Sequence, residues 1–192
     1  MYLKSSGNSL KKLPNSFGLS PTIKSLVLHH TQLDSLPNNF NQLESLMELE
    51  IQINNAEIFD LKNTLSGLYN LKTLMIYKNN LKSFPSGLNK NTKLKKVLIV
   101  NSGLTEIDSS FGKMKNIQTL ILDENKFKKF PKEIFQLKTL KELSLRENQL
   151  TSLPEDIIRI KGLKILDLTG NKIPKSDIEI ARVLLPNCKI LI

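Results

Sequence analysis

Hydrophobic residues recur along this chain at a fixed spacing. From Ile23 onward the frame L-x-x-L-x-L-x-x-N-x-L repeats, for example over residues 140–150. The copies start at residues 23, 46, 71, 94, 117, 140 and 163, so five of the six intervals are 23 residues long and one is 25. Self-similarity at such a period is typical of proteins built from stacked coils. We therefore predict a single domain over residues 1–192, with seven repeats in residues 23–173.

Each repeat predicts one strand and one return segment. The L-x-L alternation has a period of two, so it predicts a short strand with the two leucines inward and the residue between them outward. The second half reads L-P-x-x-F-x-x-L, and its proline excludes a sheet ladder and favours an extended or polyproline path. Phe17, Phe40 and Phe111 share one frame position and are expected to stack as a spine under the convex side.

The second repeat carries the two extra residues, within Phe59–Leu65. We expect a bulged or helical segment there, with Leu65 and Leu68 still inward. Asp60 and Asp108 replace the proline in two repeats, where they are predicted to cap short helical turns.

The asparagine at the ninth frame position predicts a structural ladder. Its amide is expected to face inward at a turn and to bond backbone groups of neighbouring coils. Thr31 and Ser102 replace it in two repeats, where a hydroxyl satisfies fewer partners and local softening is expected. The ladder comprises Asn8, Asn54, Asn79, Asn125, Asn148 and Asn171.

The two ends depart from the frame. Residues 1–22 contain only part of a first repeat, and no capping segment is recognisable there, so either the first coil is bare or further sequence precedes it. Residues 174–192 predict a C-terminal cap, with a helix led by Ser176-Asp177 and stopped at Pro186. Counted from Leu185, Cys188 and Ile190 then fall on the strand frame and predict a last edge strand.

The frame resembles the leucine-rich repeat family over nearly the whole chain. The 23-residue form with L-P-x-x-[FI]-x-x-L is most similar to a bacterial subclass abundant in pathogenic spirochaetes. The resemblance implies an α/β solenoid, or horseshoe, of about eight coils. A parallel sheet would line its concave face, and short helical or extended segments its convex face. It also implies binding to a partner protein, such as a host protein, or intracellular scaffolding, and it favours a secreted or cell-surface location over a cytoplasmic one.

Composition narrows the classes of partner. The net charge of +10 comes from 25 lysines and only three arginines. Bidentate recognition of bases and phosphates favours arginine, and stacking aromatics are not interleaved, so no nucleic acid is expected. The lysines predict a solvated surface, with contact to an anionic membrane or a polysaccharide as the alternative. No apolar run approaches the roughly 20 residues of a membrane span, so no insertion is expected, and no secretory signal is visible at the start.

Residues that could carry chemistry are sparse. His29 and His30 are the only histidines and, being adjacent on a strand, point in opposite directions, so a paired metal site is not expected. The single cysteine, Cys188, excludes an intramolecular disulfide and predicts a small buried hydrophobe. Paired carboxylates such as Glu48 with Glu50 lie on an open surface, which offers no means of shifting their pKa. We therefore expect neither an enzyme nor a cofactor.

The outward strand positions are those that the core leaves free to encode function. Single apolar residues suit strands anyway, but five of them are expected to be neighbours on three successive strands, as an exposed patch. We predict that a partner protein docks on this patch, or that it is buried in a weak homodimer of an otherwise monomeric chain, and that flanking charges select the partner. The patch residues are Met75, Tyr77, Leu98, Val100 and Ile121, and the flanking residues are Glu48, Glu50, Asp123, Glu142, Arg146 and Asp167.

Overall fold

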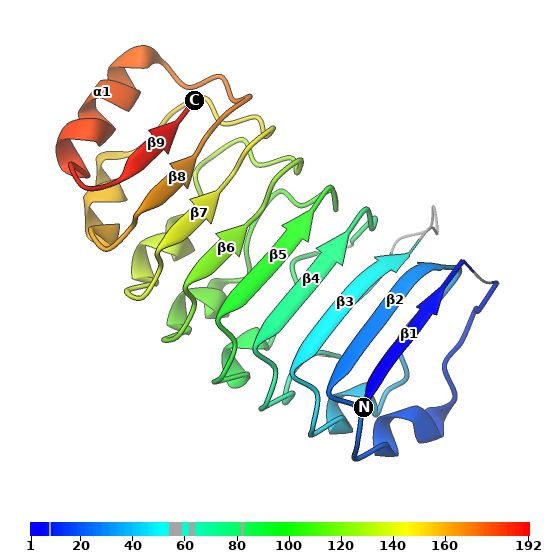
Figure 1. Ribbon diagram of the computed structural model, residues 1–192. Helices are drawn as coiled ribbons and strands as arrows, with labels where there is room; N and C mark the ends of the chain where they lie inside the picture. The colour runs from blue at the N-terminus through cyan, green and yellow to red at the C-terminus, as the bar shows by residue number, and fades with distance from the viewer. Residues whose placement is uncertain (8, 54–58, 62–63, 82) are drawn as a thin grey trace.

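The computed structural model describes residues 1–7, 9–53, 59–61, 64–81 and 83–192. Within them the chain forms one parallel sheet of nine strands, ordered as in the sequence (Figure 1). The strands are β1 (Tyr2–Ser6), β2 (Ser25–Thr31), β3 (Glu48–Ile53), β4 (Thr73–Tyr77), β5 (Lys96–Val100), β6 (Thr119–Ile121), β7 (Glu142–Ser144), β8 (Ile165–Asp167) and β9 (Lys189–Leu191). The predicted α/β solenoid is confirmed.

The core is a stack of equivalent residues from successive coils. Leu74 pairs with Val97, and Val97 pairs with Leu120, so the same frame position lies in register from strand to strand. All three side chains are fully buried. Leu65 and Leu68 of the second repeat are also fully buried, as predicted, although residues 62–63 beside them lie outside the described part. Since no single coil can enclose its own leucines, the fold is stabilised by contacts between neighbouring coils.

Most coils carry a short 3-10 helix on the return side, and the described residues between β3 and β4 contain none. The helices are η1 (Asn15–Leu19), η2 (Phe40–Gln42), η3 (Leu88–Lys90), η4 (Ser109–Lys113), η5 (Lys132–Gln136) and η6 (Glu155–Ile160). Pro14, Pro131 and Pro154 are extended, as predicted, and each is followed directly by a helix. Asp108 caps η4 as predicted, because its Oδ1 accepts the Ser110 amide at 3.0 Å. Asp60 precedes no helix within the described residues.

The predicted single spine of phenylalanines is wrong. Phe17 and Phe40 stack with their rings 6.4 Å apart, but Phe111 makes an edge contact with Phe84 at 5.0 Å. Leucines occupy the same frame position in the two intervening repeats, so the aromatic contacts fall into separate pairs.

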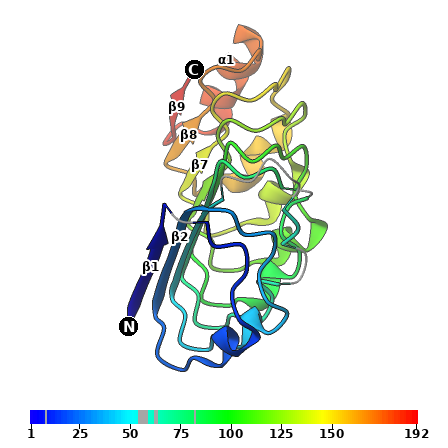
Figure 2. The ribbon, with the colours of Figure 1, turned by 90° about the vertical axis from the view of Figure 1, so that its right-hand side faces the viewer.

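The sheet lies on one side of the molecule and the 3-10 helices on the other (Figure 2). The sheet is open and uncurled rather than bent into a horseshoe. Curvature of a solenoid arises when its two sides have different widths per repeat, and short 3-10 helices are narrow enough to keep the two widths similar. The face that was expected to be concave is therefore shallow, and we call it the sheet face.

Strand β1 is an element that the repeat pattern did not predict. It pairs with β2, with Leu3 opposite Leu26 and Ser5 opposite Leu28. Ser5 occupies the position at which the other repeats have an inward apolar residue, so the L-x-L alternation that predicts a strand is missing here. Residues 1–22 thus supply a strand and a 3-10 helix, and Leu3 packs against the core while remaining partly exposed.

The C-terminal cap is present with two differences. Helix α1 (Lys175–Leu184) buries Ile178 and Ala181 against the last coil. The helix starts after Pro174, and Asp177 accepts the backbone amide of Leu153 at 2.9 Å instead of capping its own helix. In β9, Ile190 lies opposite Leu166, so the predicted register is wrong by two residues. The cause is local, since the Leu185 amide still bonds to Ala181 and delays the strand; Cys188 is only partly buried.

Candidate interaction face

Buried asparagines fix the ends of the strands. The Asn125 Oδ1 accepts the backbone amides of Ser102 and Leu104 at 3.1 Å each, and its Nδ2 donates to the Ile99 carbonyl at 2.7 Å. Asn79, Asn148 and Asn171 make equivalent bonds between coils. Asn8 and Asn54 lie outside the described residues.

The two substitutions in this ladder bond fewer groups. Among the described residues, the buried hydroxyl of Thr31 has no hydrogen-bond partner, and that of Ser102 donates only to the Val100 carbonyl, at 3.0 Å. A hydroxyl is too short to reach the neighbouring coil as the asparagine amide does. The ladder is therefore weakest in these two coils.

A row of left-handed residues turns the chain away from the sheet face. They occupy the eighth frame position, and most are not glycine although a side chain there costs about 1–2 kcal/mol. Each lies within three residues of the end of its strand, and the backbone amides of Lys78 and Glu124 still bond the next coil at 3.0 and 2.9 Å. The sequence pattern gave no signal for this conformation. The row comprises Gly7, His30, Lys78, Asn101, Glu124, Glu147 and Gly170.

The five apolar residues lie side by side on β4, β5 and β6. Met75 is opposite Leu98, Leu98 is opposite Ile121, and Tyr77 is opposite Val100. All five side chains are partly exposed, whereas the alternate residues of the same strands are buried in the core. The strands are about 4.8 Å apart, so the five form one continuous apolar surface, which we call the apolar patch.

One acidic flank begins on β3. Glu50 lies opposite Met75, and its Oε1 is 2.8 Å from the Nε2 of His29 on β2, close enough for an ion pair when the imidazole is protonated. Burial raises the pKa of the Tyr77 phenol, and the charge of Glu50 raises it further. His29 was not among the predicted site residues. Glu48 lies opposite Thr73 and is exposed.

The other acidic flank is on β7, β8 and the residues after β6. The Asp123 carboxylate accepts bonds from the Ser144 hydroxyl and the Arg146 amide. Burial raises the pKa of the Asp123 carboxyl, the two bonds lower it in part, and the charge of Asp167 raises it. Asp123 is thus a carboxylate on this face whose pKa is shifted, which the sequence did not predict. Because its bonds are internal, Asp123 supports the face rather than presenting a free charge.

The remaining flanking residues are accessible to different degrees. Glu142 accepts the Thr119 hydroxyl at 3.3 Å, and Asp167 accepts the Thr169 amide at 2.9 Å. Arg146 is exposed at the end of β7. The structure therefore brings the predicted charges together around the apolar patch.

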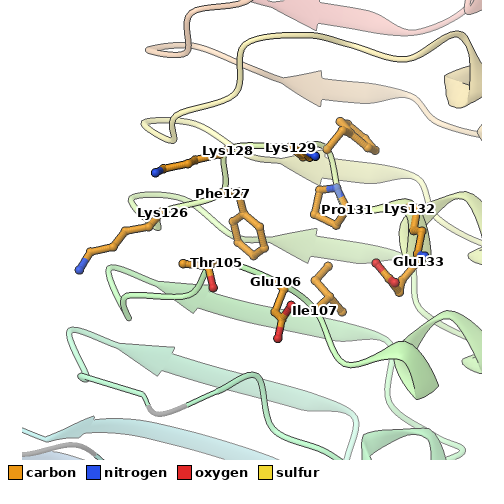
Figure 3. A pocket seen from close by; sticks show the side chains of 11 residues that line it. Thr105, Glu106, Ile107, Lys126, Phe127, Lys128, Lys129, Pro131, Lys132 and Glu133 are labelled. Carbon is orange, nitrogen blue, oxygen red and sulfur yellow. The ribbon is translucent and has the colours of Figure 1, made fainter.

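A hollow of about 600 Å³ lies away from the sheet face, where the chain leaves β5 and β6 (Figure 3). Ile107, Phe127 and Phe130 are its apolar floor. Four lysines and two glutamates form its rim, namely Lys126, Lys128, Lys129, Lys132, Glu106 and Glu133. None of the apolar patch residues lines it. In the described part of the chain, no group of three or more potential ligands could hold a metal ion, and no helix is long and apolar enough to cross a membrane.

Comparisons with known proteins agree with this architecture. The family profile described as Leucine rich repeat matches residues 115–173. A leucine-rich repeat protein of Leptospira interrogans is 30% identical, with a TM-score of 0.73 over 96% of this chain. This chain spans 53% of that protein, about half of its length. Curated proteins give no match.

Two further solved structures show the likeness of the fold alone. The leucine-rich repeat domain of the type III effector XopL is 21% identical, with a TM-score of 0.79 over 100% of this chain and 75% of its own. An internalin, InlF of Listeria monocytogenes, is 16% identical, with a TM-score of 0.73 over 99% of this chain and 60% of its own. The repeat frame, the nine parallel strands and these comparisons agree: the chain belongs to the leucine-rich repeat family.

Proposed function

We propose that this chain is a protein-binding module that recognises its partner through the apolar patch on the sheet face. One observation carries the proposal: Met75, Leu98 and Ile121 form an unbroken apolar row across three strands, at positions that the core does not use. Tyr77 and Val100 widen this row. A contiguous partly exposed apolar surface rimmed by polar residues is typical of protein contact sites.

The family supports the general class of function. Leucine-rich repeat domains, as in effectors and internalins, commonly serve as protein-interaction modules and are typically not enzymes. Three carboxylates of the sheet face, those of Asp123, Glu142 and Asp167, are held by internal bonds, an arrangement that suits a rigid surface. Recognition, rather than catalysis, is the use that this geometry supports.

The flanking charges specify the chemistry of the partner. Glu48 and Glu50 lie on one side of the apolar patch, and Glu142 and Asp167 lie on the other. A partner segment with an apolar centre and lysine or arginine at both ends would match this arrangement. A host protein and a scaffold component of the same cell both satisfy this description.

Site-specific photo-crosslinking tests the location. A benzophenone amino acid at Leu98 should capture the same partner that the unmodified chain binds, whereas the same group at exposed Lys128, beside the hollow and outside the apolar patch, should not. Capture from Lys128 and not from Leu98 would reject the sheet face. If Leu98 captures a second copy of this chain, and light scattering shows a mass that falls on dilution, the patch is a homodimer interface instead.

A further inference from the structure

The positive charge of this protein is concentrated on one edge. We define the basic edge as the seven turns that lead into β2–β8, residues 17–24, 40–47, 65–72, 88–95, 111–118, 134–141 and 157–164. These turns are less than a third of the chain, yet they hold 12 of the 28 cationic residues and one of the 18 carboxylates, Glu44. The edge carries a net charge of +11, and the rest of the molecule carries −1. The net charge of +10 is therefore a property of this edge.

The charge is densest before β5, β6, β7 and β8. The four turns there hold ten exposed cations and no carboxylate. Successive turns follow the strand spacing of about 4.8 Å, so these ten charges span roughly 15 Å. The ten residues are Lys90, Lys93, Lys95, Lys113, Lys115, Lys138, Lys141, Arg159, Lys161 and Lys164.

These cations are almost free of acidic partners. Of these ten cations, only Arg159 forms an ion pair with another described residue, Asp156, at 3.7 Å on the surface. Lys93 donates to the Asn70 amide oxygen at 2.6 Å, and Lys138 donates to a backbone carbonyl at 3.4 Å. Like charges packed this closely repel one another, so the edge does not stabilise the fold through its charge. A solvated surface alone would show the mixed signs found elsewhere on the molecule.

A second feature of the same edge is a hollow of about 200 Å³ between the turns before β5 and β6, whose lining includes Leu94 and Met114. Lys113 and Lys115 line it together with Asn89, Thr92 and Asn116. It is smaller than the roughly 300–1,000 Å³ of a typical small-molecule pocket, and so suits one unit of a longer chain. Ammonium, amide and hydroxyl groups are the partners that sulfate, carboxylate and sugar hydroxyls require.

We infer that the basic edge binds a linear anionic polysaccharide, bearing sulfates or carboxylates, that runs across successive turns. Nucleic acid fits less well, because the four turns contain a single arginine and their aromatics, Phe111 and Phe135, are buried. A membrane surface fits less well, because Ile158 is the one exposed large apolar residue in them. This site shares no residue with the apolar patch. A variant can therefore lose polysaccharide binding and keep protein binding, or the reverse.

Titration with heparin and with chondroitin sulfate at about 0.15 M ionic strength tests the inference. The wild-type chain should bind at least one of them. The variant Lys113→Glu, Lys115→Glu, Lys138→Glu should weaken binding by roughly tenfold or more. A matched control changes the same charge on the rim of the larger hollow (Lys126→Glu, Lys128→Glu, Lys129→Glu) and should weaken binding by no more than about threefold.

Three results would overturn the inference: no binding of either polysaccharide by the wild-type chain, equal losses in the two variants, or tighter binding to phosphatidylserine vesicles or to a single-stranded oligonucleotide. Glutamine at the same three edge positions removes the positive charges without adding negative charges that repel the polysaccharide, and it should give a smaller loss in the same direction. Circular dichroism should show that no variant melts at a lower temperature than the wild type, because these lysines are exposed and their replacement leaves no cavity.

Discussion

Asn148 holds the buried backbone amide of Phe127, one coil earlier, at 3.1 Å. Its Nδ2 donates to the carbonyls of Leu122 and Leu145 at 3.0 Å each. Replacing Asn148 by alanine leaves these backbone groups without partners in a buried site. We predict a loss of roughly 2–4 kcal/mol in the free energy of unfolding, measured by urea denaturation.

The matched control for this prediction is Asn116→Ala. Asn116 also donates to a carbonyl of the previous coil, that of Thr92 at 2.7 Å, but it is exposed. Water replaces the lost bond there, so the change should cost no more than about 1 kcal/mol. Equal costs at the two positions would show that the buried ladder has no special part in stability.

Thr31 and Ser102 should respond in opposite directions when their hydroxyls are removed. The Thr31 hydroxyl is buried without a partner in the part of the chain that the structure describes, so Thr31→Val keeps the shape, removes that penalty and should raise the free energy of unfolding by roughly 1 kcal/mol. The Ser102 hydroxyl bonds to Val100, so Ser102→Ala should lower it by a similar amount. A loss on Thr31→Val would mean that its hydroxyl has a bonded partner in solution.

The left-handed backbone at Lys78 predicts a contrast between two substitutions. Its φ is 53°, where a β-branched side chain is strongly disfavoured. Lys78→Val should lower the free energy of unfolding by more than about 1 kcal/mol, and Lys78→Gly should keep or raise it. Lys96→Val, at an extended strand position, should cause no comparable loss. Similar behaviour of Lys78→Val and Lys96→Val would contradict the assigned conformation.

Asp123 predicts a distinctive dependence of stability on pH. Its folded pKa is raised, mainly by burial, so just above the ordinary aspartate range the folded chain binds more protons than the unfolded chain. The contribution of Asp123 to stability therefore falls as pH rises through that window. Asp123→Asn keeps an oxygen that can accept from Ser144 and Arg146, so it should remove this fall. If the melting temperatures of the wild type and of Asp123→Asn change in parallel between pH 4 and pH 7, Asp123 does not cause the fall.

The repeat frame predicted most of the fold because buried leucines repeat wherever coils stack. It failed where that physical requirement is relaxed. Ser5 breaks the frame in β1, an edge strand with one neighbour, and the helix of the cap shifts Ile190 by two residues from its expected register. The left-handed turns were missed because most of them carry side chains, such as that of Lys78, instead of the expected glycine.

The apolar patch could be located from sequence because strand alternation and register follow from the frame. The pairing of His29 with Glu50 and the enclosure of Asp123 by Ser144 could not be predicted. Both depend on side-chain conformations between neighbouring strands, which spacing alone leaves undefined. The basic edge combines residues that are far apart in the sequence and that the fold brings to the same side of the coils.

The proposed function requires that the apolar patch on the sheet face binds a protein partner. The most direct measurement is the Kd of the partner captured from Leu98, for wild type and for Met75→Glu, Leu98→Lys. A charge-matched control, Ser25→Glu, Ile165→Lys, changes the same face outside the apolar patch. We predict that the patch variant weakens binding roughly a hundredfold or more, that the control changes it by less than about threefold, and that neither melting temperature moves appreciably. Unchanged binding by the patch variant would contradict the account.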